Sequence, residues 1–69
     1  MDTEKIIAAH KALTEIITNN PIYFADKDAS DIADDFIESY ANDKKLPYKE
    51  TPNIEVDNAV SEALHLTGI

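Results

Sequence analysis

The sequence contains no cysteine, no arginine and no tryptophan, and its only glycine is Gly68. Without cysteine, neither a disulfide nor a thiolate zinc site can stabilise the fold. The formal charge is −8, from 14 acidic residues against 6 lysines, so binding to nucleic acid or to an anionic membrane through a basic patch is disfavoured. A single glycine near the C-terminus cannot form a glycine-rich phosphate-binding loop.

Long apolar runs are also lacking. No segment approaches the roughly 20 consecutive apolar residues of a membrane span. The N-terminal sequence MDTEKII has no basic region followed by an apolar stretch, as a signal peptide would. A length of 69 residues leaves room for one domain. We therefore expect residues 1–69 to form a single acidic helical domain, soluble and located in the cytoplasm of a bacterial host cell.

Three segments have the apolar spacing that is typical of amphipathic helices. The first is expected to begin at Asp2 or Thr3 and to end at about Asn19. Ile7 lies about 100° from Ile6 around this helix, where it can form either the edge of the core or a contact point for a partner. The buried stripe of the helix is predicted to consist of Ile6, Ala9, Leu13, Ile16 and Ile17.

The sequence Asn19-Asn20-Pro21 predicts the end of the first helix, because the residue before a proline avoids the helical conformation. Pro21 can open a short extra helical turn near residues 20–25, capped by Asn20. We expect Tyr23 and Phe24, the aromatic residues of this turn, to close one end of a helical bundle.

The second segment is expected to begin at Asp28 or Ser30 and to fray between Asn42 and Lys45. Its apolar residues fall within an arc of roughly 140°, and acidic residues fill roughly the opposite 120°. The apolar arc consists of Ile32, Ala33, Phe36, Ile37 and Tyr40, and the residues that we call the acidic face are Asp28, Asp31, Asp34, Asp35 and Glu38.

The third segment follows a linker of residues 46–52, which is expected to cross the surface in an extended form. Thr51 or Asn53 can cap this helix, with Pro52 as its first residue, and Gly68 should end it after Thr67. The alternation over residues 54–57 leaves open whether the start is helical or extended. The apolar arc is Val56, Ala59, Val60, Ala63, Leu64 and Leu66. The three segments together predict an all-α fold, a small three-helix bundle with a short extra turn.

Two patterns at the start of the second helix suggest a ligand or a modification. The spacing Asp26-x-Asp28-x-Ser30 matches the first half of a calcium loop, but the turn glycine is replaced by Asp31 and the bidentate glutamate by Ile37. Acyl carrier proteins, which are also small, acidic and helical, carry their phosphopantetheine on a serine directly preceded by aspartate; here Ala29 stands between Asp28 and Ser30. Helix capping explains the same residues, so we expect neither a bound metal nor a cofactor.

Catalytic residues are not evident. His10 borders the apolar stripe of the first helix, where a partly buried, hydrogen-bonded histidine is the common outcome, and His65 should be exposed. Neither histidine has a carboxylate at i, i+4 spacing or a second histidine at a metal-ligand spacing. The acidic residues of the second helix lie on its solvent side, without the burial that shifts a carboxyl group toward acid–base catalysis. We therefore predict that the protein is not an enzyme.

The acidic face remains as the candidate binding surface. Four of its members, Asp28, Asp31, Asp35 and Glu38, follow one another at intervals of three or four residues, and no lysine lies between Asp28 and Asn42. Such a row can resemble a line of phosphates and occupy a basic nucleic-acid groove of another protein. Equally, it can be a solvated surface that only keeps the chain soluble.

The pattern Ile32-Ala33-x-x-Phe36-Ile37-Glu38-x-Tyr40, preceded by a helix that ends in Asn-Asn-Pro, resembles short proteins encoded in phages and prophages of Gram-positive bacteria. The resemblance covers roughly the first 45 residues. It implies a small phage accessory protein. Small acidic phage proteins often block a host nucleic-acid-binding or defence protein, as many anti-CRISPR proteins do.

The leading hypothesis is a non-enzymatic module that binds a basic host protein, such as a CRISPR effector, through the acidic face, with Ile7 and Tyr48 as apolar anchors. It predicts no direct binding of nucleic acid or membrane. The alternative is an assembly protein whose apolar helix faces pair between chains, for example in a homodimer. A carrier or calcium-binding domain is the third hypothesis.

Overall fold

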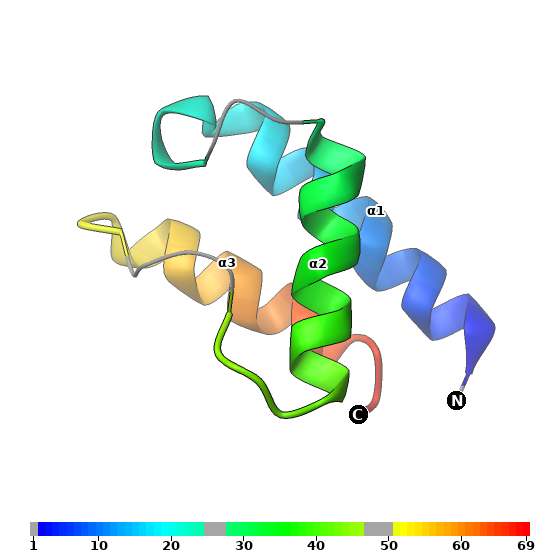
Figure 1. Cartoon of the computed structure of the whole chain (residues 1–69). Coiled ribbons are helices and arrows are strands. Elements are labelled where there is room, and N and C mark those ends of the chain that lie inside the picture. The colour runs from blue at the N-terminus through cyan, green and yellow to red at the C-terminus, as the bar shows by residue number, and fades with distance from the viewer. Residues whose placement is uncertain (1, 25–27, 47–50) are drawn as a thin grey trace.

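In the residues that the structure describes, the chain folds into three α-helices and one short 3-10 turn (Figure 1). The structure, a computed structural model, describes residues 2–24, 28–46 and 51–69. Within these residues there is no β-strand, and the prediction of a small all-α three-helix bundle is confirmed. The elements in chain order are α1 (Thr3–Asn19), η1 (Pro21–Tyr23), α2 (Ala29–Ala41) and α3 (Ile54–His65).

Each α-helix begins at a side-chain cap. A carboxylate oxygen of Asp2 accepts a hydrogen bond from the backbone N–H of Glu4 at 3.0 Å, and Asn53 Oδ1 accepts one from Glu55 N at 3.0 Å. Asp28 caps α2 in the same way. These oxygens satisfy backbone donors that have no partner within the helix. The predicted starts of α1 and α2 are therefore confirmed, as is Asn53 as the cap of α3.

The end of α1 differs from the prediction in one detail. Asn20 was expected to cap the turn that Pro21 opens, but its side chain makes no capping hydrogen bond to η1. Instead, Asn20 Nδ2 donates to the carbonyl oxygen of Ile16 at 2.8 Å, and Asn20 N donates to Ile17 O at 3.2 Å. Asn20 therefore satisfies two of the last carbonyl groups of α1, one through its side chain and one through its backbone N–H.

The C-terminus of α2 is closed rather than frayed, contrary to the prediction for Asn42 to Lys45. Asp43 has a positive φ of 53°. Its N–H donates to Tyr40 O at 3.3 Å, and Lys44 N donates to Ser39 O at 2.8 Å. This pair of bonds forms a Schellman motif, with an aspartate at the left-handed position that glycine usually occupies.

The segment that precedes α3 is held by Asp57. Residues 54–57 are helical, which settles the alternative that the sequence left open. Pro52 lies outside the helix, contrary to the prediction, because Thr51 folds back: its N–H and its hydroxyl both donate to Asp57 Oδ1 at 3.1 Å. Asn53 is thereby left as the cap. Four of the seven linker residues, 47–50, lie outside the described part of the chain.

One hydrophobic core joins all three helices and the turn. Phe36 of α2 is completely buried, and Phe24 approaches it edge to face, with ring centroids 6.2 Å apart. Phe24 and the partly buried Tyr23 thus close one end of the core, as predicted. Leu66 was predicted to be buried but is 49% exposed, because α3 ends at His65 and the chain turns away. The other buried apolar residues are Ala9, Leu13, Ile17, Ile32, Ala33, Val56, Val60, Ala63 and Leu64.

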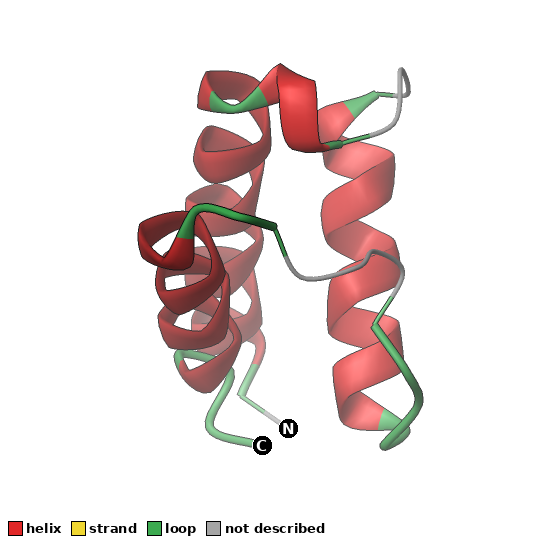
Figure 2. Cartoon of the chain, turned by 90° about the vertical axis from the view of Figure 1, so that its left-hand side faces the viewer, coloured by secondary structure: helices red, strands yellow, loops and turns green. Residues whose placement is uncertain are grey.

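The central helix is α1, which packs against both α2 and α3, whereas α2 and α3 make few contacts with each other. Figures 1 and 2 show α3 antiparallel to α1, and α2 lying along another side of α1. Two grooves follow from this arrangement, one between α1 and α2 and the other between α1 and α3. None of the described helices is long and apolar enough to cross a membrane.

Candidate protein-binding site

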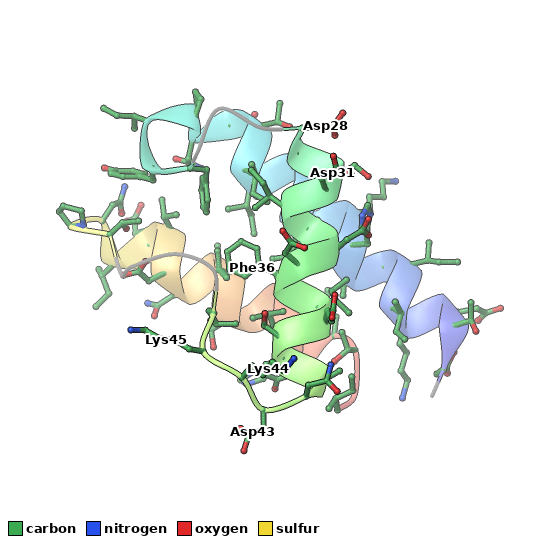
Figure 3. The ribbon with its side chains drawn as sticks, in the orientation of Figure 1. Asp28, Asp31, Phe36, Asp43, Lys44 and Lys45 are labelled. Atoms are coloured by element: carbon green, nitrogen blue, oxygen red, sulfur yellow. The ribbon has the colours of Figure 1, made fainter. Side chains whose placement is uncertain are left out.

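All five residues of the acidic face are exposed, and they lie on the side of α2 that faces away from the core. Figure 3 shows Asp28 and Asp31 at the N-terminal end of α2, whereas the ring of Phe36 points toward the interior. Asp28 has a structural role as well, since its carboxylate accepts a hydrogen bond from Ser30 N at 2.8 Å. The negative charge of Asp31 in the first turn also suits the positive end of the helix dipole.

The charges of the acidic face are not neutralised by lysine. In the described part of the chain, no lysine forms an ion pair with Asp31, Asp35 or Glu38. These three residues follow one another at steps of four and three positions, which places them about 4.5–6 Å apart along the helix axis. The face is therefore a row of solvated carboxylates at a spacing that destabilises the isolated helix by roughly 0.2–0.5 kcal/mol per like-charged pair.

Asp34 differs from its neighbours because it contacts a histidine of α1. His10 Nε2 lies 2.9 Å from Asp34 Oδ1 and 3.1 Å from the carbonyl oxygen of Ser30. A carbonyl oxygen can only accept, so Nε2 carries a hydrogen and donates to both oxygens. The prediction of a partly buried, hydrogen-bonded His10 is confirmed, as is the exposure of His65. The link to Asp34 was not predicted, because helical spacing relates only residues of the same helix, and His10 and Asp34 lie on different helices.

This cluster contains serine, histidine and aspartate, but its geometry does not form a catalytic triad. In a triad one ring nitrogen takes the proton of the serine, while the aspartate orients the imidazole through the other ring nitrogen. Here Asp34 Oδ1 and Ser30 Oγ approach the same atom, His10 Nε2, at 2.9 Å and 3.5 Å. The aspartate therefore does not orient the ring from the nitrogen opposite the serine, and the cluster joins α1 to α2.

A groove of about 780 Å³ lies beside this cluster, between α1 and α2. We call it the α1–α2 groove. Its apolar lining comes from Ile6, Ile7, Ile37 and Ala41. Asp34, Glu38 and Lys11 also line it, so that two carboxylates and one ammonium group stand beside apolar side chains. The groove combines an apolar surface with part of the acidic face.

The structure thus brings some of the predicted site residues together and separates others. Ile7, the predicted apolar anchor, is 62% exposed and shares the groove with Asp34 and Glu38. The other three acidic-face residues do not line the groove. Tyr48, the second predicted anchor, lies outside the described residues. No sequence signal marked the groove itself, because it depends on how α1 and α2 pack.

Two residues of the calcium and carrier patterns, Asp28 and Ser30, lie at the start of α2. Asp26, the first residue of the calcium pattern, lies outside the described part of the chain. Ser30 is the second residue of α2, is exposed, and receives the cap from Asp28. Within residues 2–24, 28–46 and 51–69, no three histidine or acidic side chains are grouped closely enough to hold a metal ion.

Comparison with known proteins returns no relative: no protein-family model, no curated protein and no solved structure matches the chain. A proposal about function therefore rests on the charge, exposure and grooves of this structure.

Proposed function

We propose that the protein is a small non-enzymatic binding module that occupies a basic, nucleic-acid-binding surface of another protein through the acidic face of α2. The observation that carries the proposal is the row of Asp31, Asp35 and Glu38, exposed and without a lysine partner in the described residues. If these residues served only solubility, lysines could stand between them and remove the repulsion along the helix. A basic partner removes that repulsion on binding.

Electrostatic attraction gives such a module a high rate of association and selectivity for basic partners. A formal charge of −8 on a chain of 69 residues attracts a positively charged groove over a distance of about one Debye length, which is about 8 Å at physiological ionic strength. Exposed charges steer the encounter and discriminate against acidic surfaces, but they contribute little net affinity. A second, apolar contribution is therefore needed to hold the complex together.

The α1–α2 groove can supply this contribution. Ile7 and Ile37 line it next to Asp34 and Glu38, so an apolar side chain of the partner can enter while a neighbouring lysine or arginine meets the carboxylates. Apolar contacts at the centre of an interface, surrounded by charged groups, are the usual arrangement of residues that dominate binding energy. In this proposal the acidic face sets the rate of association, and the groove sets the rate of dissociation.

The biological consequence would be inhibition. A partner whose nucleic-acid groove is occupied by carboxylates cannot bind its own nucleic acid, so the protein would act as a phage-type inhibitor of a host or defence protein, such as a CRISPR effector. This choice of partner follows the resemblance to short phage proteins expected for roughly the first 45 residues, for which the comparisons found no matching relative.

The test is affinity capture from a Gram-positive bacterial lysate at low and at high ionic strength. The native chain is compared with a variant that carries Asp31→Asn, Asp34→Asn, Asp35→Asn and Glu38→Gln. We expect a basic nuclease, polymerase or repressor to be retained by the native chain at low salt and lost from the variant. Competition by nucleic acid for the captured protein would show that its nucleic-acid groove is the surface being occupied.

The matched control neutralises four exposed glutamates outside α2, namely Glu4, Glu15, Glu55 and Glu62, and so has the same net charge as the first variant. If this control loses the partner to the same extent, binding does not depend specifically on the acidic face and the assignment to α2 is wrong. If the native chain retains only further copies of itself, the assembly hypothesis is supported instead. Mass spectrometry of the expressed protein tests the carrier hypothesis through a phosphopantetheine adduct.

A further inference from the structure

A second groove, with a volume of about 590 Å³, lies between α1 and α3. We call it the α1–α3 groove. None of its lining residues belongs to α2, and none lines the α1–α2 groove. The C-terminal part of α1 lies beside α3, which runs antiparallel to it (Figure 2). The groove is therefore a separate surface on α1, formed by two antiparallel helices.

The floor of this groove is apolar and incompletely covered. Ala12 and Ile16 of α1 and Ala59 of α3 are only partly buried, and Leu66 is 49% exposed. The two alanines leave room for another main chain to come close. An exposed leucine at the edge of a groove loses its contact with water when a partner covers it, which is favourable by about 25 cal/mol for each Å² of apolar surface buried.

Exposed isoleucines adjoin the opposite end of the groove. Asn20 and Asn53 line that end. Ile54 follows Asn53 directly and is 70% exposed, and Ile22 follows Asn20 by two positions and is 85% exposed. Of the five exposed large apolar side chains in the described part of the chain, Leu66 lines the groove, and Ile54 and Ile22 follow lining residues by one and two positions in the sequence. Exposed apolar side chains at a groove are typical of protein-binding surfaces.

Both walls of the groove carry negative charge. Glu15 projects from α1, and Glu55 and Glu62 project from α3; all three are exposed. Among the described residues, no lysine lines the groove and no cation forms an ion pair with these glutamates. A partner that covers the apolar floor must therefore bring positive charge to both edges.

We propose that the α1–α3 groove binds an amphipathic helix of another protein, one with an apolar stripe flanked on both sides by lysine or arginine. A helix laid between two antiparallel helices extends the bundle by one member and buries its stripe on the apolar floor, which is a common mode of peptide recognition. The flanking cations reach Glu15 on one side and Glu55 and Glu62 on the other.

A second copy of this chain fits the groove poorly. In a two-fold symmetric dimer the same patch of each copy faces its counterpart. Glu15, Glu55 and Glu62 of one copy would then approach the same three residues of the other, with no lysine in the lining to separate them. Like charges brought together across an interface suppress association. The charge of the groove thus favours a basic helix over self-association.

The proposal is tested with two synthetic helical peptides that have the same leucine and alanine stripe. One is flanked by lysines and the other by glutamates. Fluorescence anisotropy gives the affinity for the full chain, and backbone amide chemical shifts locate the peptide. We expect the lysine peptide alone to bind, with the largest shifts at Ala12, Ile16, Ala59 and Leu66.

Two charge variants test whether the peptide binds specifically at the α1–α3 groove. The triple variant Glu15→Gln, Glu55→Gln and Glu62→Gln should bind the lysine peptide about tenfold more weakly, equivalent to about 1.4 kcal/mol. The matched triple variant Asp2→Asn, Glu4→Gln and Asp43→Asn has the same net charge, lies outside both grooves and outside the acidic face, and should bind it as the native chain does. All six residues are exposed, so both variants are expected to fold.

Four outcomes would overturn the proposal. These are equal losses of affinity in the two variants, binding of both peptides alike, chemical-shift changes confined to α2, and a dimer held together through the groove. The test does not depend on the proposed function, because the acidic face of α2 can bind a basic protein whether or not the α1–α3 groove binds a helix.

Discussion

His10 of α1 lies 2.9 Å from the carboxylate of Asp34 in α2, and this contact joins the two helices at the surface. Asp35, the next residue along α2, has no such partner in the described part of the chain. Both aspartates have the same acidic neighbours at helical spacing, Asp31 and Glu38. A comparison of substitutions at Asp34 and Asp35 therefore isolates the contribution of the His10 contact to stability.

Asp35→Asn should stabilise the protein, because it removes repulsion from two neighbours at roughly 0.2–0.5 kcal/mol each. Asp34→Asn removes the same repulsion but also loses the ionic part of the His10 contact, since the amide oxygen accepts the hydrogen bond without a negative charge. Since exposed ion pairs contribute only about 0.2–1 kcal/mol, its net effect should be close to zero. Urea unfolding at pH 6 and low salt measures both variants. Equal stabilisation by the two would show that the contact with His10 contributes nothing.

Asp43→Gly should raise the free energy of unfolding by up to about 1 kcal/mol. Asp43 holds a positive φ of 53° in the cap of α2, a conformation that glycine adopts without steric cost. The change also removes a negative charge from the carbonyl end of the helix. Asp43→Asn is the control, since it removes the charge and keeps the side chain. If asparagine stabilises as much as glycine, the charge and not the backbone conformation is the unfavourable feature.

Phe36→Ala should unfold the chain at room temperature. Phe36 is completely buried, and truncating such a side chain costs about 3–5 kcal/mol. A single small core supplies only about 3–5 kcal/mol in total. Circular dichroism should show the loss of helix. Ile22→Ala is the control, because Ile22 is 85% exposed and its truncation should change stability by less than about 0.5 kcal/mol. Cooperative, near-native melting of Phe36→Ala would contradict this account of the core.

The fold could be predicted because its determinants are local. Each helix begins at an aspartate or asparagine within hydrogen-bonding reach of its own first turn, as Asp2, Asp28 and Asn53 show. Apolar spacing identifies Leu13 and Phe36 as core residues without knowledge of their partners. The helical period of apolar residues and the cap residues depend only on neighbours in the sequence, so a single sequence is enough to predict them.

The errors of prediction arose where distant residues or rare backbone conformations decide the structure. Thr51 binds Asp57 rather than capping the helix, and Asp43 takes a conformation more typical of glycine. Thr67 is 3% exposed and donates its hydroxyl to Leu64 O at 2.7 Å, a burial that a search for apolar spacing cannot detect. The same holds for the candidate site: its exposed acids follow from helical periodicity, but both grooves depend on how the helices pack.

Ile7→Ser should accelerate dissociation of the basic partner in the proposed function and leave its association rate nearly unchanged. Ile7 lines the α1–α2 groove and is 62% exposed, so the substitution removes apolar contact without disturbing the core or the acidic face that steers the encounter. Surface plasmon resonance with the captured partner separates the two rates. Ile54→Ser is the matched control, since Ile54 is 70% exposed and lies outside this groove. A slower association in Ile7→Ser, or equal losses in both variants, would show that the groove does not hold the partner and that the acidic face acts without an apolar anchor.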